Sequence, residues 1–161
     1  LLRNTVTFIR LIHFLAIFWM IAGIGNTIIP IYGAWAQDNL KLRSITLSAS
    51  SKNYSYWLLP GVISSGITGY LYAGVDGLNV ITSGWLLITG LIWIIQIFIL
   101  LPLFGIGLRR VHYLALQAEK RGTTTQELDD ALADKAPLVL GTLIIISTLL
   151  ITIIPIFKPF S

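Results

Sequence analysis

The chain has 161 residues, of which 55% are hydrophobic and only 11% are charged, whereas a soluble domain carries about 25% charged residues. It has no cysteine, which excludes disulfide bonds, iron–sulfur ligation and thiol chemistry. The net charge is +4, and the basic residues flank apolar segments, which fits lipid head groups rather than nucleic acid as their partner. These features predict a membrane protein that does not bind nucleic acid.

Charged residues are absent from four long segments: 11–37, 53–75, 77–108 and 136–157. Each is long enough to cross the hydrocarbon core, which takes about 20 apolar residues in a helix. The first is longer than the apolar part of a signal peptide, about 7–15 residues, and is interpreted as a retained span. We predict an all-α fold, an integral membrane four-helix bundle that forms a single transmembrane domain over residues 1–161. The expected spans are about 8–35, 54–74, 81–108 and 137–157.

The first two connections between spans differ in character. Residues 37–53, QDNLKLRSITLSASSKN, are expected to form a polar loop. Residues 74–79, rich in Gly, Asp and Asn, are expected to form a tight turn. We also expect Pro30 and Pro102 to bend the helices that contain them.

The third connection is predicted to be helical. The third helix should continue past its apolar part to Arg121, because Gly122 suits the position after a helix end. Thr124 and Glu127 have the spacing of a capping box, which would open a short acidic helix. Residues 108–136 are therefore predicted to form a helical hairpin outside the bilayer.

Lysine and arginine are unevenly distributed between the two ends of the predicted bundle. One end has Arg3, Arg10 and Lys158. The other end has Lys41, Arg43, Lys52, Arg109, Arg110, Lys120, Arg121 and Lys135. Because cytoplasmic loops are enriched in Lys and Arg, loops 37–53 and 108–136 are predicted to be cytoplasmic, in a bacterial inner membrane. The two arginines ahead of the first span favour the opposite orientation.

Histidine is the residue type here that best suits a haem or a metal. The only two, His13 and His112, should lie at opposite ends of the bundle, because residues 84–109 alone rise ~38 Å. This topology excludes a haem held by both histidines of one chain, and Met20 lies ~10 Å along the helix from His13, too far to share its iron. His13 is then either the ligand of a five-coordinate haem or of one shared with a partner chain, or an interfacial residue beside Arg10. The interfacial interpretation is favoured.

Four small residues recur at every fourth position of the second span: Gly61, Ser65, Gly69 and Ala73. Small residues at this spacing let helix backbones approach closely in lipid. The stripe is either an interface with another subunit or a packing face inside the bundle, where Gly23 and Gly25 could meet it. We favour the second, because a four-helix bundle needs such a face.

Gln96 lies near the middle of the third span, where an unpaired amide costs several kcal/mol. It belongs either to a polar ligand or pigment pocket or, as we favour, to an interhelical hydrogen bond. Partners at a similar depth on the other spans are Ser64, Ser65, Ser147 and Thr148.

No Asp, Glu, Lys or Arg lies within the four apolar runs. Coupled transporters usually use ionisable residues within the membrane, so a coupled pump is disfavoured, and no catalytic or metal site is predicted. Arg10, Arg109 and Arg110 are expected to anchor their helices at lipid head groups, and His112 to contact solvent or lipid. An acidic cluster is interpreted as a solvated helix face, or else as a docking patch: Glu127, Asp129, Asp130 and Asp134.

Several motifs carry a resemblance to a known family: LIHFLAIFWMIAGIG, YWLLPGVISSGITGYLYAG, GWLLITGLIWIIQIFILLPLFGIGLRR and the closing IFKPF. In these the chain resembles a small bacterial four-span family of predicted integral membrane proteins, a domain of unknown function. That family looks distantly similar to the copper-resistance D proteins and the J-type protoporphyrinogen oxidases. The similarity to the oxidases implies a functional histidine early in the first helix, which His13 matches. The further basic residues within their spans are missing here.

Three functional hypotheses follow. The favoured one is a non-catalytic subunit or scaffold of a larger membrane complex, such as a respiratory or photosynthetic one, because the sequence has no catalytic constellation. The second is a b-type haem or porphyrin-binding redox protein that uses His13. The third is a small-molecule or metal permease, which is weakened by the lack of polar residues that would line a path.

Overall fold

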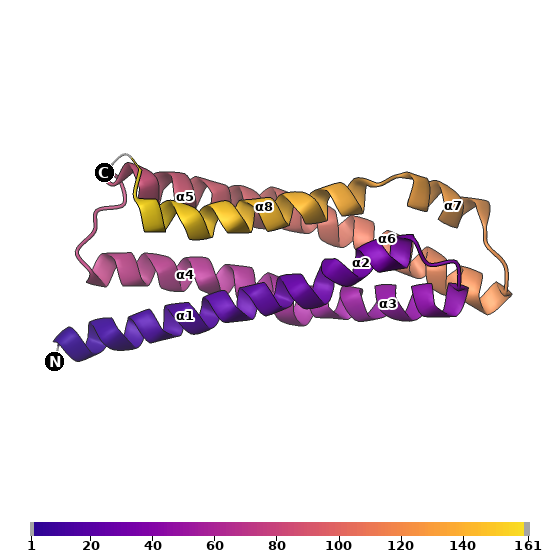
Figure 1. Cartoon of the computed structure of the whole chain (residues 1–161), viewed down its shortest axis with the longest axis horizontal. Coiled ribbons are helices and arrows are strands. Elements are labelled where there is room, and N and C mark those ends of the chain that lie inside the picture. The colour runs from indigo at the N-terminus through magenta and orange to yellow at the C-terminus, as the bar shows by residue number, and fades with distance from the viewer. Residues whose placement is uncertain (1, 160–161) are drawn as a thin grey trace.

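The computed structural model describes residues 2–159, without the side chains of residues 2 and 3. Arg3, counted above for sidedness, and Phe160 of the closing motif therefore lie outside the described side chains. Every regular element within residues 2–159 is a helix (Figure 1), which confirms the all-α prediction. The elements are α1 (Leu2–Thr27), α2 (Ile29–Trp35), α3 (Leu40–Asn53), η1 (Tyr54–Leu58), α4 (Leu59–Val75), α5 (Gly84–Ile95), η2 (Gln96–Leu100), α6 (Leu101–Arg121), α7 (Gln126–Ala133) and α8 (Ala136–Phe157).

Four helical stretches among the described residues are long and apolar enough to cross a membrane: Asn4–Trp35, Leu40–Val75, Gly84–Arg121 and Gln126–Phe157. They confirm the predicted four-helix membrane bundle. The longest has 38 residues and would rise ~57 Å as a continuous helix, whereas the hydrocarbon core is about 30 Å thick. The bundle therefore extends well beyond the bilayer.

Residues 40–53 are helical and only residues 37–39 form a loop, so the prediction of a loop over 37–53 was wrong for most of its length. Asn39 caps α3 by accepting a hydrogen bond from the Leu42 N–H at 3.1 Å, and α3 continues into η1 and α4. Its many serines lower helix propensity, but α3 packs along α6, and tertiary packing supplies most of the stability of a protein helix. The buried residues have helical spacing: Arg43, Ser44, Leu47 and Ser50.

In the hairpin between α6 and α8, one residue at the end of α6 and one at the start of α7 mark the limits of these helices. Gly122 follows α6 with a φ of 73°, in the left-handed region that glycine adopts without strain, as expected. Thr125, not Thr124, caps α7, because its Oγ1 accepts a hydrogen bond from the Leu128 N–H at 3.3 Å. Glu127 is thus the second residue of α7 and not the third, which a capping box requires. The predicted box was out of register by one residue.

Two of the prolines follow π-helical turns. In η1 before Pro60, and in η2 before Pro102, a backbone N–H bonds to the carbonyl five residues earlier. In an α-helix a proline ring clashes with the carbonyl four residues earlier. The extra residue of a π turn relieves this clash. Both helices therefore run through their prolines. Near Pro30 the chain is interrupted instead, between Thr27 and Ile29.

The long helices form two antiparallel pairs, α1 with α4 and α5 with α8 (Figure 1). In the first pair the backbones nearly touch. A Cβ on Gly61 would lie 2.7 Å from the Cα of Met20, and a Cβ on Gly23 would lie 2.7 Å from the Cα of Leu58. Only glycine permits this approach at the two positions.

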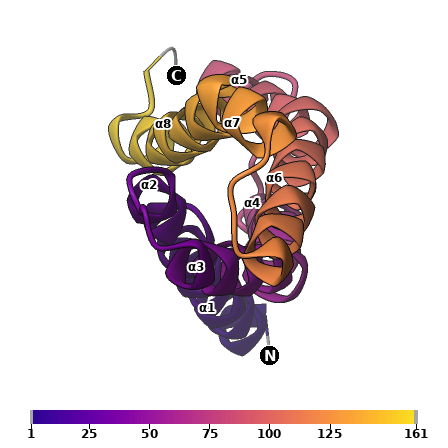
Figure 2. The same cartoon turned by 90° about the vertical axis from the view of Figure 1, so that its right-hand side faces the viewer.

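The two pairs are joined at the end away from the chain termini. There α2, α3, α6 and α7 surround the long axis (Figure 2), and the main hydrophobic core fills the space between them. Its fully buried members include Ile28, Ile31, Leu47, Phe104, Leu108 and Leu128. Toward the termini the pairs separate (Figure 1), and a small cluster of Ala73, Trp85 and Leu86 replaces the main core.

Candidate functional site

Where the helix pairs separate, the described residues surround a cavity of ≈ 390 Å³, within the range of about 300–1,000 Å³ typical of ligand pockets. Its walls come from all four long helices, and the turn after α4 completes one end. The lining residues are His13, Phe14, Ile17, Met20, Ser65, Gly66, Gly69, Tyr70, Tyr72, Ala73, Asp76, Leu78, Trp85, Leu86, Thr89, Gly90, Trp93, Ile151, Thr152, Pro155, Ile156 and Lys158. Most of these side chains are apolar or aromatic, so the cavity suits a largely apolar ligand.

His13 lies in the wall of this cavity and is held there by α4. Its Nδ1 is 3.1 Å from the Thr68 Oγ1. The Thr68 hydroxyl also lies 2.7 Å from the Ser64 carbonyl, and in the arrangement where it donates to that carbonyl, Nδ1 is the donor to Thr68. In the neutral ring Nε2 then carries the lone pair. Nε2 has no hydrogen-bond partner among the described residues and is accessible to a water-sized probe.

Tyr72 and Arg10 support the same ring. The Tyr72 ring stacks on His13 with centroids 6.2 Å apart. Arg10 donates from Nε to the Tyr72 hydroxyl at 3.1 Å, and its Cζ lies 5.3 Å from the Tyr72 ring centroid. Arg10, predicted as a lipid anchor, is therefore also tied to the end of the cavity.

Aromatic rings lie directly on glycines in the opposite wall. The Trp93 ring covers Gly66, and the Tyr70 hydroxyl covers Gly90, so that a Cβ on either glycine would clash with the ring or hydroxyl. Trp93 is also fixed by a hydrogen bond of 2.8 Å from Nε1 to the Val62 carbonyl. The shape of this wall therefore depends on glycine at both positions.

The family model for predicted integral membrane proteins named DUF2269 matches residues 7–159. The chain belongs to the DUF2269 family. No curated protein matches its sequence, and no solved structure does. The resemblance to a four-span family of unknown function is confirmed, whereas the distant similarity to copper-resistance D proteins and protoporphyrinogen oxidases stays a prediction. The DUF2269 description gives a membrane location and no activity.

The small-residue stripe of this DUF2269 chain faces inward. Gly61 meets α1, as described above, and the Ser65 hydroxyl lies 3.3 Å from the Met20 Sδ. Gly69 lies against His13, where a Cβ would come within 3.0 Å of Cε1, and Ala73 belongs to the cluster near the termini. Gly23 also packs on this helix, but nothing lies within 4 Å of a Cβ placed on Gly25.

Gln96 lies in the interior of the DUF2269 bundle, outside the lining of the cavity. It is 0% exposed, and its Nε2 donates to the Thr148 Oγ1 at 2.9 Å and to the Ile144 carbonyl at 3.4 Å. Its Oε1 has no partner among the described residues. The side chain therefore links η2 to α8.

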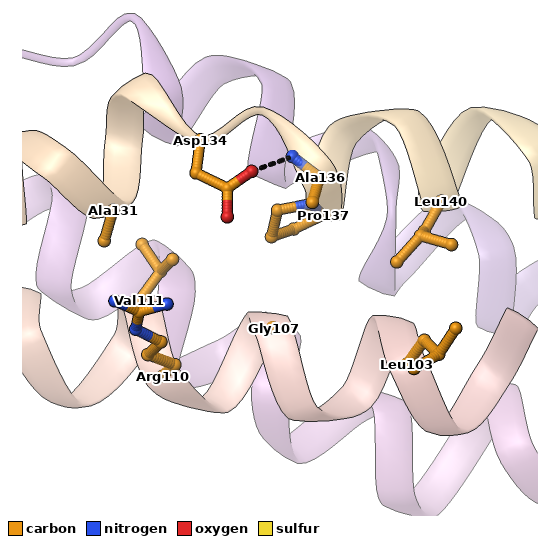
Figure 3. A pocket seen from close by; sticks show the side chains of 9 residues that line it. All are labelled: Leu103, Gly107, Arg110, Val111, Ala131, Asp134, Ala136, Pro137 and Leu140. Atoms are coloured by element: carbon orange, nitrogen blue, oxygen red, sulfur yellow. Dashed lines mark hydrogen bonds between the residues drawn. The ribbon is translucent and has the colours of Figure 1, made fainter.

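The remaining predicted residues lie at the other end of the DUF2269 fold. Arg109 is exposed. Arg110 lines a small pocket of ≈ 50 Å³ with Asp134 and Pro137 (Figure 3). His112 stacks on Tyr113 with ring centroids 5.3 Å apart. The structure therefore does not bring the two histidines together.

We searched the described residues for side chains that could together bind a metal ion. No group of three or more His, Asp or Glu residues there is arranged to hold a metal ion. The DUF2269 cavity offers one imidazole nitrogen, several hydroxyl groups and aromatic faces. These groups can stack on a ligand and hydrogen-bond to it.

His13 could be identified from the sequence, but the residues that contact it and the aromatic residues of the cavity wall could not. Thr68, Tyr72, Trp85 and Trp93 carried no signal of their own, because they become neighbours of the cavity only when four helices assemble. The sequence signal that could have indicated ring-on-glycine packing is the frequency of glycine and aromatic residues in the second and third spans.

Proposed function

We propose that the protein binds a small, mainly apolar molecule within the membrane, in the cavity beside His13. The observation that supports this most directly is the imidazole of His13 in the wall of a cavity of ≈ 390 Å³, with no hydrogen-bond partner for Nε2 among the described residues. Binding pockets commonly combine apolar walls with a few polar groups that fix orientation. The ligand is therefore expected to carry an O–H or N–H donor on a ring-shaped apolar body.

The aromatic walls favour a ring in particular. Trp85, Trp93, Tyr70, Tyr72 and Phe14 all line the cavity, and aromatic side chains pack on other rings in offset or edge-to-face arrangements. A flexible acyl chain would gain less from these flat faces.

Tryptophan quenching tests the proposal, with 4-bromophenol as the probe. Replacing Trp19, Trp35 and Trp57 by Phe leaves only the two tryptophans that line the cavity, and the protein is studied in lipid nanodiscs. We expect saturable quenching, and a Kd about threefold to tenfold weaker for 4-bromoanisole, which lacks the hydroxyl donor. His13→Phe should abolish this difference.

A matched pair of variants tests the location of the binding site. Thr152 lines the cavity, whereas its neighbour Ile153 does not. Thr152→Phe should fill the space and weaken binding of 4-bromophenol, and Ile153→Phe should not. Non-saturable quenching in the parent protein, or equal effects of the two variants, would contradict the proposed function.

The same nitrogen favours a second candidate, a b-type haem or another tetrapyrrole with His13 as its axial ligand. A Soret band in the purified protein that is lost in His13→Phe would support it. A colourless protein from haem-supplemented cells that still binds 4-bromophenol would exclude it.

The accessory-subunit hypothesis now has less support, because the stripe that might have formed its interface packs inside the bundle. A subunit can still carry a ligand, and migration with other proteins on a native gel in mild detergent would revive the hypothesis.

The permease hypothesis needs a path across the bilayer. The lining residues of α1 lie between His13 and Met20, and those of α8 and the residue after it lie between Ile151 and Lys158. These short ranges support a pocket confined to one half of the bilayer.

We further propose a bacterial inner membrane as the location, with residues 37–53 and 108–136 in the cytoplasm. The His13 end would then face outward. Because the chain has no native cysteine, single variants can test this. A membrane-impermeant maleimide added to intact cells should label Thr82→Cys and leave Lys41→Cys unlabelled, and the reverse result would invert the orientation.

A further inference from the structure

We propose that the cavity opens sideways to the lipid between α1 and α8, so that its ligand is a membrane-dissolved ring compound and not a solute taken from water. This inference rests on the proposed ligand-binding function and names the class of ligand. It follows from a difference between the two seams where the helix pairs face each other: α4 against α5, and α1 against α8.

The seam between α4 and α5 is closed by reciprocal contacts. Trp93 of α5 covers Gly66 of α4, and Tyr70 of α4 covers Gly90 of α5. The Trp93 indole also donates to the Val62 carbonyl across this seam at 2.8 Å, and the Tyr70 and Trp93 rings meet edge to face with centroids 6.2 Å apart. A ligand has no room to pass between these side chains.

The contacts that join the α1–α2 segment to α8 lie at the far end of the bundle. There Tyr32 of α2 contacts the Thr142 hydroxyl at 2.7 Å, and Gly141 packs on Ile28. Among the described residues, no hydrogen bond or ring contact links residues 8–20 of α1 to residues 147–157 of α8.

Apolar, exposed side chains flank this open part of the seam. Phe14 of α1 is 53% exposed and Ile156 of α8 is 70% exposed, although both line the cavity. In a membrane-spanning bundle such side chains contact lipid chains. The cavity is thereby continuous with the hydrocarbon phase.

The other route, from water, would pass the end of the cavity near Asp76 and Lys158. Both residues are exposed, and the Lys158 Nζ lies 5.7 Å from the Trp85 ring centroid. A molecule that matches largely apolar walls leaves water favourably, at about 25 cal/mol for each Å² of apolar surface. It therefore concentrates in the bilayer, where the open seam gives it access.

Thiol labelling distinguishes the two routes. Thr89 of α5 lines the cavity on the side away from the open seam, and its neighbour Ile88 does not line it, so Thr89→Cys reports on the cavity and Ile88→Cys on the lipid-facing surface. In reconstituted vesicles the apolar reagent N-phenylmaleimide should label Thr89→Cys. A charged trimethylammonium thiosulfonate should label it about a hundredfold more slowly, relative to the exposed variant Thr82→Cys, because a charge is excluded from the apolar phase.

Two obstructions then locate the opening. Tryptophan at both Ile17 and Thr152 narrows the seam, and Leu78→Trp narrows the end near the head groups. We expect the first to slow labelling of Thr89→Cys by N-phenylmaleimide about tenfold, with Ile88→Cys unaffected, and the second, which also places a larger side chain in the cavity lining, to slow labelling less than the first.

The opposite result overturns the inference. Fast reaction of Thr89→Cys with the charged reagent, or slowing by Leu78→Trp alone, would mean that the cavity opens to water. Saturable quenching by 4-bromophenol would then still support the proposed function. If that quenching is absent, the proposed function itself fails, whichever reagent reaches position 89.

Discussion

The two ends of the bundle are built from similar apolar residues but are packed differently. At the hairpin end a large core is filled, and Phe104 is 0% exposed. At the end with the termini, α1, α4, α5 and α8 enclose a cavity of ≈ 390 Å³. Within the bilayer, helix association depends on shape, because lipid chains are as apolar as these side chains.

What each glycine faces explains how closely the helices around the cavity approach each other. Gly23 and Gly61 face a neighbouring backbone, so α1 and α4 approach until their main chains nearly touch. Gly66 and Gly90 face an aromatic side chain instead, which stands between α4 and α5 and holds them apart. Glycine can therefore close a helix pair or help to build a cavity wall, depending on its partner.

The largest effect should come from emptying the tight end. Phe104→Ala removes a fully buried ring and should lower the free energy of unfolding by about 3–5 kcal/mol. Phe14→Ala, at the edge of the cavity, should change it by less than about 1 kcal/mol, because the side chain is already half exposed. Unfolding by SDS titration in mixed micelles measures both, and similar losses would contradict the contrast between the two ends.

The next largest effect should come from the close contact between Gly61 and the backbone of Met20. Gly61→Ala should destabilise the protein by about 1–3 kcal/mol, because the new Cβ meets the backbone of Met20, which cannot move independently. Gly25→Ala is the matched control. Nothing lies near that position, and alanine favours helix by up to about 1 kcal/mol, so the variant should be neutral or slightly more stable in the same titration.

A smaller effect concerns the cavity. Thr68→Val removes the acceptor that holds the hydrogen on Nδ1 of His13, so Nε2 is no longer fixed as the acceptor. We expect the preference for 4-bromophenol over 4-bromoanisole to fall about threefold, with unfolding nearly unchanged. Tryptophan quenching checks this, and an unchanged preference would mean that Thr68 does not set the tautomer.

The smallest effect should come from Gln96. Gln96→Leu loses the hydrogen bond to Thr148 but also removes the unpaired Oε1, so the net loss should be about 0.6 kcal/mol, typical of interhelical bonds in membranes. A double-mutant cycle with Thr148→Val isolates the coupling. A coupling of several kcal/mol would show that this buried bond carries far more of the stability than we expect.

The spans could be predicted from sequence because the bilayer imposes a simple requirement, a long uncharged stretch, which hydropathy reads directly. The helix before the second span could not, because the polar composition of residues 37–53 matched a loop. The buried residues Arg43, Leu47 and Ser50 are helically spaced, but two of them are polar, so no apolar period marked this helix in the sequence.

The candidate site was predicted in part. His13 was singled out because a histidine in an apolar helix is unusual, but its interpretation as an interfacial residue used only its distance from Arg10 along the chain. The cavity depends on where four helices diverge, which no local pattern specifies. The same limit applies to the stripe, whose spacing predicted close packing without naming the partner of each residue.

The reciprocal pairs across α4 and α5 also constrain how the family can vary. A relative with a larger residue in place of Gly66 has to carry a smaller one in place of Trp93, and the same exchange links Gly90 to Tyr70. An alignment of the family should therefore reveal two correlated position pairs joining the second and third helices. Members that lose both pairs together would have given up the cavity wall while keeping the membrane-spanning scaffold.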